Sequence, residues 1–396
     1  MKIVQINTIF PYGSTGKIVN DIENYCKNLN IRNVVLYGHG IKSYEGHYKI
    51  CSTLYMKFQA LRSRITGIMY GGCFFSTLKA IRIIENEKPD IVHIHCINGN
   101  MINIFKLISY LKKNKIRTVI TNHAELYYTA NCGHSLECNR YLTGCGKCPR
   151  LKKETKSWFF DGTHRSWIKM KKAFDGFNHL IVVNVSPWLT KRASTSTILK
   201  NFKHVTILNG IDTSIFYYKN NYVKKQEKLI FQTTANFSDD PNDIKGGFYL
   251  IKLAKMFENK NVKFVVAGKY SAGLSVPSNM ILLGQIFDQN KLAELYSQAD
   301  LFVLTSKKET FSMVTIESLC CGTPVVGFNA GAPEEIAIDK FSKFVKHGDI
   351  EAMYNAIIQF LNSNFDKEEI SQIARKKYSR EQMSMEYLEI YKELIN

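Results

Sequence analysis

Short apolar runs alternate with amphipathic segments along most of this chain. The apolar runs 2–6, 33–38 and 89–95 are continuous and short, which is typical of buried strands. The segments 17–29 and 104–113 place their apolar residues at helical spacing. Because strands that alternate with helices form parallel sheets covered on both faces, the pattern predicts an α/β fold.

The second half of the chain repeats this alternation. Its predicted strands are 229–232, 262–268, 281–284, 301–304 and 324–326. A polar stretch at 212–228 has few periodic apolar residues and is the expected linker. A chain of 396 residues is too long for one ordinary core. We therefore expect two doubly wound domains that face each other across a cleft, with residues 1–205 in the first and 206–378 in the second.

The composition is that of a soluble globular protein, with 45% hydrophobic and 22% charged residues. Ten irregularly spaced cysteines favour a reducing cytoplasm over a disulfide framework. Met1–Ile6 has a strand pattern rather than that of a secretion signal. No apolar run reaches the roughly 18 residues that a membrane span needs, so we expect a cytoplasmic location.

The formal net charge of +19 belongs entirely to the first half of the chain. Residues 1–200 carry 30 Lys and Arg against 11 Asp and Glu, whereas residues 201–396 carry 23 of each kind. A basic domain beside a neutral one indicates an anionic partner, which is a phospholipid surface, a diphosphate-bearing acceptor or nucleic acid. The alternative is a lysine-rich surface that faces only solvent.

Two glutamates, Glu309 and Glu317, lie eight positions apart in the run 306–326. The pattern there predicts a strand at 301–304, a polar loop that holds Glu309, a short helix that holds Glu317, and a turn at Gly322. In an open parallel sheet, ligands bind at the carboxyl ends of the strands. A helix that begins near 311–314 offers backbone N–H groups and a positive dipole end, which suit a diphosphate.

This run resembles the acidic pair of retaining GT-B glycosyltransferases of family 4, in which seven residues separate two glutamates. The similarity continues through the turn 322–325 and the segment 330–334. The resemblance implies two Rossmann-like domains, with residues 379–396 as a helix that packs back on the first. It also implies that Glu309 orients the donor sugar and that Glu317 binds the nucleotide ribose. The implied donor site further contains Gly284, Gln285, Phe311, Ser312, Met313 and Val314.

Lys245, in the run 243–247, resembles the family lysine that neutralises the leaving diphosphate. Negative charge builds on the departing phosphate, so the chemistry asks for a cation at this place. Most relatives also have an arginine several residues earlier, whereas this chain has Ala235–Phe237 and then three aspartates. A solvated surface lysine is the alternative interpretation.

Gly13 and Gly16 lie between the first predicted strand and the first predicted helix, and let the backbone approach a phosphate closely. A plain turn is the alternative, but the loop resembles the glycine loop that borders the donor diphosphate in GT-B enzymes. His123 follows the predicted strand 117–121 and resembles a family histidine that reaches the donor sugar. His95 competes for that role, and the deeper His93 is expected to be a core residue.

Four cysteines cluster in the sequence, at Cys132, Cys138, Cys145 and Cys148. Four thiolates so close together bind zinc tetrahedrally and close a loop that has no core of its own. The first pair is separated by five residues, more than in common structural sites, so structural zinc, free thiols and disulfides stay open as interpretations. The segment resembles a cysteine-rich insertion of colanic-acid and capsule glycosyltransferases.

The stretch 55–84 interleaves basic and apolar residues, and this composition fits an anionic membrane surface or a core-facing helix pair with charged outer faces. The chain as a whole resembles a retaining, metal-independent hexosyltransferase of bacterial capsule or colanic-acid synthesis. The resemblance implies a UDP- or GDP-linked donor, a lipid-linked oligosaccharide acceptor, no catalytic cofactor, no nucleic acid, and a position on the inner face of the plasma membrane. It gives the catalytic roles to His123, Lys245 and Glu309. A nucleotide-sugar epimerase and a basic nucleic-acid-binding protein are the alternatives.

Overall fold

The computed structural model describes residues 1–220 and 226–396. Its contacts divide the chain into two compact units, Met1–Leu208 with Met383–Asn396, and Asn209–Gln382. Five residues of the predicted linker, 221–225, lie outside the described part. Among the described residues, no helix is both long and apolar enough to cross a membrane.

The first unit contains a seven-stranded parallel sheet in the order β3-β2-β1-β4-β5-β6-β7. Its strands are β1 (Lys2–Phe10), β2 (Arg32–Gly40), β3 (His47–Lys49), β4 (Ile91–Ile94), β5 (Thr118–Asn122), β6 (Leu180–Asn184) and β7 (Lys203–Thr206). The strand order reverses between β1 and β4, which lie side by side. That reversal is the topological switch point, where open α/β sheets bind ligands at the carboxyl ends of their strands.

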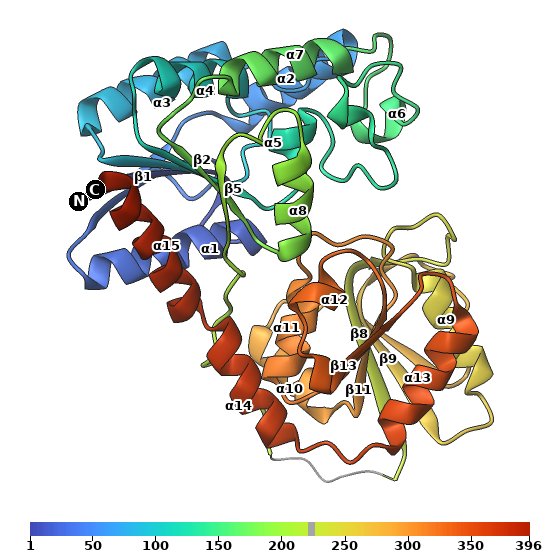
Figure 1. Cartoon of the computed structure of the whole chain (residues 1–396). Helices are drawn as coiled ribbons and strands as arrows, with labels where there is room; N and C mark the ends of the chain where they lie inside the picture. The colour runs from blue at the N-terminus through green and yellow to red at the C-terminus, as the bar shows by residue number, and fades with distance from the viewer. Residues whose placement is uncertain (221–225) are drawn as a thin grey trace. The chain divides into compact units, whose positions relative to one another are not determined.

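Helices cover both faces of this sheet (Figure 1). On one face, α1 (Ser14–Asn28) and α15 (Arg380–Ile395) share a core with the strands, built on Ile3, Ile22, Ile91, Val119 and Tyr387 among others. The other face carries α2 (Thr53–Thr66), α3 (Phe74–Glu87), α4 (Ile104–Lys113) and α7 (Thr163–Phe174). The short helices α5 (Leu126–Thr129), α6 (Leu151–Glu154) and α8 (Pro187–Thr195) lie in the connections.

Local sequence explains why such helices begin and end where they do, and α4 is an example. The side chain of Asn103 accepts a hydrogen bond from the Lys106 amide and so caps the first turn. The buried positions of α4 are Ile104, Phe105, Leu107, Ile108 and Leu111, which form one stripe. Lys112 and Lys113 in the last turn complement the helix dipole.

The second unit contains a six-stranded parallel sheet in the order β10-β9-β8-β11-β12-β13. Its strands are β8 (Lys228–Phe237), β9 (Val262–Tyr270), β10 (Met280–Gly284), β11 (Leu301–Leu304), β12 (Val325–Phe328) and β13 (Ser342–Val345). The helices are α9 (Gly247–Met256), α10 (Gln289–Gln298), α11 (Met313–Cys320), α12 (Pro333–Ile336), α13 (Ile350–Asn362) and α14 (Lys367–Tyr378). The core cluster of this sheet includes α9 and α13, whereas α11 packs on α14 and α10. Here the switch point lies between β8 and β11.

Two segments that lead into and out of the second unit cross each other at Gly210. The amide of Ile211 donates to the carbonyl of Tyr378 at 2.9 Å, and the amide of Arg380 donates to the carbonyl of Ile211 at 3.0 Å. A Cβ on Gly210 would lie 2.6 Å from the Cα of Arg380, so any larger residue would push the two segments apart. An ion pair between Arg380 and Asp212, at 2.7 Å, adds to the crossing.

Candidate functional site

The second unit brings Lys245 and Glu309 together at its switch point. Lys245 follows β8 and Glu309 follows β11, and these strands are neighbours in the sheet. The Nζ atom of Lys245 lies 2.7 Å from Oε1 of Glu309. The Lys245 side chain is 37% exposed and that of Glu309 15%, so the pair is open to solvent on the side of the lysine. A cation and a carboxylate therefore stand at the strand ends where a ligand is expected.

The backbone at Lys245 is fixed by Thr305, the residue that follows β11. The Thr305 hydroxyl donates to the carbonyl of Lys245 at 3.0 Å and accepts from the Gln232 amide at 2.9 Å. Gly246 has φ 69°, and a Cβ there would lie 2.1 Å from the Thr305 carbonyl oxygen. Only glycine permits this close approach, which brings the loop of Lys245 onto the end of β11.

The backbone at Glu309 is fixed from the other side, by the loop that follows β12. The amide of Glu309 donates to the carbonyl of Ala330 at 2.9 Å. The carboxylate of Glu334 accepts from the amides of Ala330 and Gly331 at 2.9–3.0 Å and so holds that loop. Glu334 therefore has a structural role in supporting Glu309.

Helix α11 begins at Met313, close to the predicted position, after an unusual residue. Ser312 has φ 89° and ψ 81°, which is uncommon for a residue other than glycine. Its hydroxyl bonds to that of Thr315 at 2.8 Å and does not cap the helix amides. Strained backbone of this kind persists at sites that position a ligand, and here it precedes the amides of Met313 and Val314.

Glu317 lies on α11 and is held by a tyrosine that the sequence did not reveal. The buried hydroxyl of Tyr296 donates to Oε2 of Glu317 at 2.9 Å. Burial and the nearby carboxylate raise the pKa of Tyr296 well above its ordinary value, so the hydroxyl keeps its proton. Gly284, with φ 75°, ends β10, and the adjacent Gln285 is exposed.

No arginine stands near Asn236 in the sequence, and the structure gives the aspartates there a local role. Asp240 accepts from the amide of Asn242 at 2.8 Å, and Asp243 accepts from the amide of Lys245 at 2.9 Å. Both carboxylates thus stabilise the turn that carries Lys245.

The first unit brings His95 and His123 together at the carboxyl ends of β4 and β5. Nδ1 of His95 lies 3.2 Å from Nε2 of His123, and Nε2 of His95 lies 2.9 Å from Oε1 of Gln5. The Gln5 amide nitrogen faces the carbonyl of Val19, so its oxygen faces His95. His95 must then donate through Nε2 and accept from His123, which fixes the tautomers of both rings.

Both histidines are neutral at physiological pH, because burial disfavours the imidazolium form. Burial lowers the pKa of His123 to about 4 and holds the pKa of His95 well below its ordinary value. His93 is fully buried, and its ring nitrogens contact the Tyr391 hydroxyl at 2.6 Å and the Thr121 hydroxyl at 2.8 Å. His93 is thus a core residue, as its deeper position predicts.

The predicted glycine loop also lies at this edge of the first sheet. Gly13 precedes α1 with φ 74°, and Gly16 lies in the first turn of the helix. A Cβ on Gly16 would lie 2.9 Å from the carbonyl oxygen of Ile9, so the helix start packs directly on β1. The close packing accounts for Gly16 without any ligand, and the phosphate role of the loop stays a prediction.

The comparisons with known proteins give this arrangement a family. Residues 220–377, which form most of the second unit, match the family described as "Glycosyl transferases group 1". The chain carries a group 1 glycosyltransferase domain. It is 21% identical to the putative colanic acid biosynthesis glycosyl transferase WcaC of Escherichia coli over 100% of both chains. It is 26% identical to the capsular polysaccharide biosynthesis glycosyltransferase CapM of Staphylococcus aureus, over 50% of this chain and 56% of the relative.

Solved structures show the same fold as this chain. A sucrose-phosphate synthase from Thermosynechococcus elongatus superposes with a TM-score of 0.69 at 14% identity, over 100% of this chain and 99% of the other. Anabaena Alr3699/HepE, solved in complex with UDP-glucose, superposes with a TM-score of 0.64 at 14% identity, over 99% and 100%. The chain has the GT-B fold that the sequence predicts.

The cysteine cluster lies outside the matched domain, in the loop between α5 and α7. Cys132 interacts electrostatically with each of the other three thiols, and burial raises the pKa of Cys132, Cys145 and Cys148. The described cysteines form no disulfide. Within the described residues, no three His, Cys, Asp or Glu side chains are grouped as ligands of a metal ion. Structural zinc therefore stays a prediction.

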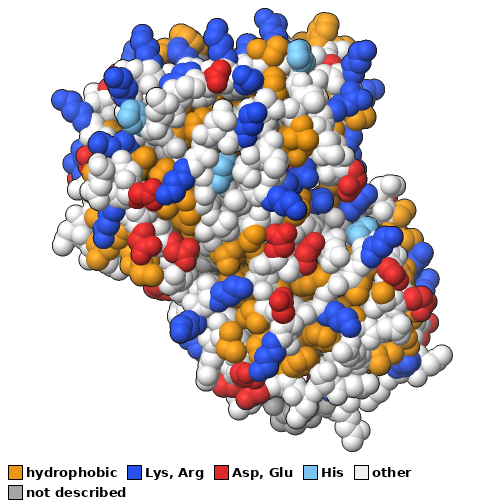
Figure 2. Space-filling view, in the orientation of Figure 1, with side chains coloured by type: hydrophobic (Ala, Val, Ile, Leu, Met, Phe, Trp, Pro, Cys, Tyr) orange, Lys and Arg blue, Asp and Glu red, His pale blue; other side chains and the backbone are white. Residues whose placement is uncertain are grey.

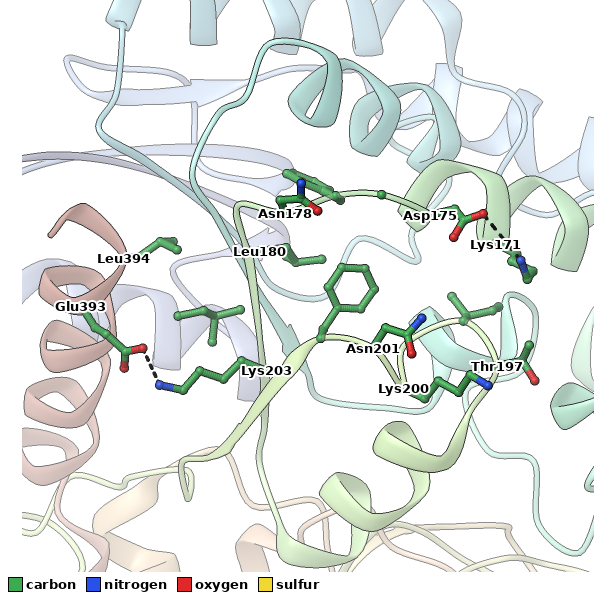
Figure 3. A pocket seen from close by; sticks show the side chains of 15 residues that line it. Lys171, Asp175, Asn178, Leu180, Thr197, Lys200, Asn201, Lys203, Glu393 and Leu394 are labelled. Carbon is green, nitrogen blue, oxygen red and sulfur yellow. Dashed lines mark hydrogen bonds and ion pairs between the residues drawn. The ribbon is translucent and has the colours of Figure 1, made fainter.

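A cavity of about 710 Å³ in the first unit lies away from these residues. It opens beside the first residues of β6 and β7, whereas His95 and His123 follow the last residues of β4 and β5. Figure 3 shows two of its lysines pointing at carboxylates, Lys171 at Asp175 and Lys203 at Glu393, and both are ion pairs. Because two of its three lining lysines are neutralised in this way and only Lys200 remains, the cavity is a poor site for a diphosphate.

Proposed function

We propose that this glycosyltransferase moves a hexosyl unit from a nucleotide-diphosphate sugar to an oligosaccharide acceptor, with retention of the anomeric configuration. The observation that carries the proposal is the Lys245–Glu309 pair at the switch point of the second unit. The strained start of α11 and the Glu317–Tyr296 hydrogen bond belong to the same sheet edge. Together they offer one cation, a set of helix amides and two carboxylates.

Each of these groups suits one part of such a donor. Lys245 and the amides of Met313 and Val314 supply positive charge for the diphosphate, on which negative charge grows as the sugar leaves. Glu317, oriented by Tyr296, would accept hydrogen bonds from the ribose hydroxyls, and Gly284 with Gln285 would border the base. Glu309 would accept from the sugar hydroxyls. Because the cation and the helix amides already provide charge, the proposed step needs no catalytic metal.

His123 of the first unit would contact the donor sugar in our proposal. Its low pKa limits it to hydrogen bonding. A neutral imidazole at pH 7 orients a sugar hydroxyl through a hydrogen bond and does not act as a strong acid. The Gln5–His95 contact would keep the tautomer of His123 constant during turnover. We assign the acceptor proton to the leaving phosphate oxygen, on the same face of the sugar, and name no side chain as general base.

The choice of donor and acceptor rests on the relatives. A protein of the same fold has been solved with UDP-glucose, so a UDP-linked sugar is our first candidate and a GDP-linked sugar the second. Two relatives are named for colanic acid and capsular polysaccharide synthesis, which supports an oligosaccharide acceptor, carried on a lipid in our proposal.

The test begins with thermal unfolding in the presence of UDP-, GDP- and ADP-linked sugars. The right donor at about 100 times its dissociation constant should stabilise the protein by about 2.7 kcal/mol. NMR of the product made with that donor should then show the anomeric configuration of the donor sugar. If no nucleotide sugar stabilises the chain, or if the donor is converted without any acceptor as an epimerase would do, the proposal is wrong.

A further inference from the structure

Helix α2 in the first unit buries polar side chains and exposes large apolar ones. Its buried residues are Met56, Gln59 and Ser63, two of which are polar. Its exposed residues include Leu54, Phe58, Leu61 and Ile65, whose side chains are 79%, 62%, 43% and 41% exposed. These four positions fall on one helical stripe. Water-facing helices of soluble proteins show the opposite pattern, so this stripe is suited to an apolar environment.

Exposed aromatic side chains extend the stripe at both ends of α2. At its start, the Tyr55 hydroxyl accepts from the amide of Phe75 at 3.3 Å, and the Phe74 and Phe75 side chains are 54% and 73% exposed. At its end, the amide of Trp158 donates to the carbonyl of Arg64 at 2.8 Å. The residues Trp158, Phe159 and Phe160 are 50%, 69% and 63% exposed.

We call this surface the apolar face. It consists of Leu54, Phe58, Leu61, Ile65, Phe74, Phe75, Trp158, Phe159 and Phe160. Helix α2 alone gives it a length of about 20 Å. Aromatic side chains expose about 150–250 Å² each when free, so the face exceeds the few hundred Å² that monomeric proteins leave uncovered.

Positive charges accompany the apolar face along α2, whereas the exposed Asp161 follows Phe160 at its other end. The sequence of α2 contains Lys57, Arg62 and Arg64 and no acidic residue. Arg64 stacks over the Trp158 ring at 5.9 Å, and Lys106 lies over the Phe74 ring at 4.4 Å. Figure 2 shows Lys and Arg side chains, with hydrophobic side chains between them, over the part of the first unit that contains α3 and α7.

A basic hollow of about 480 Å³ opens next to Phe74, between α4 and α7. Its lysines are Lys106, Lys112, Lys169 and Lys172, and its described lining contains no acidic side chain. Lys112 donates to the carbonyls of Lys172 and Asp175 at 2.9 and 2.8 Å, so one lysine is held by backbone. A group of ammonium ions beside exposed aromatics matches a phosphate headgroup above an acyl layer.

We propose that the apolar face and the basic hollow bind the first unit to an anionic phospholipid bilayer. The apolar stripe of α2 and the aromatic run 158–160 would enter the headgroup boundary, with α2 parallel to the membrane plane. The lysines of the hollow and the basic residues of α2 would contact lipid phosphates. A second copy of the chain fits less well, because it would bring two positively charged surfaces together.

The test uses flotation of the full-length protein with phosphatidylcholine vesicles that contain or lack phosphatidylglycerol. Binding should require the anionic lipid and should fall steeply with salt. Trp158 fluorescence should be quenched by brominated acyl chains, and Trp158→Phe should float normally but lose that quenching. Two variants should each reduce binding at least tenfold: the apolar variant Phe58→Ser, Phe159→Ser, Phe160→Ser and the charge variant Lys57→Gln, Arg62→Gln, Arg64→Gln.

Matched substitutions in the second unit control for lost surface and lost charge. Ile373→Ser removes an apolar side chain that is 42% exposed, and should leave flotation unchanged. A second control removes three exposed charges of α9 and the following turn, Lys252→Gln, Lys255→Gln and Lys260→Gln. Calorimetry with UDP measures the donor site of the folded protein without any membrane. A wild-type protein that binds UDP but does not float would therefore count against the membrane proposal and not against the glycosyltransferase proposal.

Three results would overturn the inference. Absence of flotation with both lipid mixtures would show that the face does not meet a bilayer. Equal flotation of the wild type and the apolar variant would show that binding is electrostatic adsorption elsewhere. A concentration-dependent dimer that the apolar variant abolishes would make this face a contact between copies of the chain.

Discussion

The two units share one strand order over their first six strands, but the residues that follow those strands differ in kind. The first unit places two neutral histidines at its carboxyl edge, the buried His95 and the half-buried His123, joined at 3.2 Å. The second places a solvent-accessible ion pair at the equivalent edge, joined at 2.7 Å. The same scaffold therefore presents weakly polar hydrogen-bonding groups in one unit and full charges in the other, which shows that the site, not the fold, decides the chemistry.

The net charge of each half also fails to predict which charged groups stand at its sheet edge. Residues 1–200 hold all of the excess positive charge, yet their strand ends are neutral. Residues 201–396 are neutral in sum, yet they contain the cation at the strand ends. Net charge thus indicates which kind of partner the surface of a domain binds, whereas individual residues determine the chemistry of its site.

Removing the cation of the second unit should have the largest effect on turnover. Lys245→Ala should lower kcat about 100–1000-fold, because charge on the leaving phosphate grows toward the transition state. Steady-state kinetics with the identified donor measures this, with Lys252→Ala on α9 as the control. A rise in KM at constant kcat would show that Lys245 binds the ground state only.

The neutral histidine of the first unit should show itself in the dependence of stability on pH. The pKa of His123 is about 4 in the folded chain and about 6.5 when unfolded, so between these values only the unfolded chain gains a proton. The free energy of unfolding is unaffected above pH 7 and should fall by about 2 kcal/mol at pH 5 through this group.

NMR of the His123 ring and unfolding curves of His123→Gln measure this contribution. The ring should stay neutral down to about pH 5, and the variant should lose part of the acid sensitivity. A ring that titrates near pH 6.5 would contradict the buried, neutral state.

Loss of the Glu317 carboxylate should have a smaller effect than loss of Lys245, and the effect should be on nucleotide affinity. Glu317→Ala should weaken UDP binding about tenfold or more, because a charged hydrogen bond contributes about 1.5–3 kcal/mol. Tyr296→Phe removes only the group that orients Glu317, so its effect should be about threefold. Calorimetry with UDP gives both values, with Glu351→Ala as the control. Unchanged affinity in Glu317→Ala would remove Glu317 from the nucleotide site.

Changes at the cysteine cluster should have the smallest effect on donor binding, because the cluster belongs to the first unit and the donor residues belong to the second. We expect one zinc ion per chain after purification without added zinc, held by Cys132, Cys138, Cys145 and Cys148. Its removal by a chelator should leave UDP affinity unchanged within about twofold, since the donor residues lie in the other unit. A metal-free chain that is fully folded would show that the four thiols are structural.

Sequence patterns predicted the parallel α/β fold and the order of its main elements. The strands 262–268 and 301–304 correspond to β9 and β11, and the predicted helix 104–113 coincides with α4. The strand β3, of three residues, is too short for a periodic signal and escaped prediction. The strand β13 escaped prediction because it begins with Ser342 and Lys343 and lacks a continuous apolar run. The positions of Glu309 and Lys245 beside each other follow from strand order, which a motif alone does not reveal.

The partners of the site residues could not be predicted, because they are distant in sequence. Tyr296 and Glu317 are 21 positions apart, and Gln5 and His95 are 90 apart. The stretch 55–84 showed basic and apolar residues, but its composition left both orientations of α2 open. Only the structure shows that Gln59 and Ser63 face inward while Phe58 and Leu61 face outward.

The first unit begins the chain but cannot finish folding first, because its helix α15 follows the whole second unit in the sequence. The hydrogen bond from Tyr391 to His93 joins residues 298 positions apart, and Met383 and Tyr387 belong to the same core. During translation, the first unit emerges early, but the part of its sheet that α15 covers stays exposed until the entire second unit has been made. A ribosome that stalls before residue 383 would release a first unit whose core around Ile3, Ile91 and Val119 lacks α15, and such a chain is a substrate for chaperones and proteases.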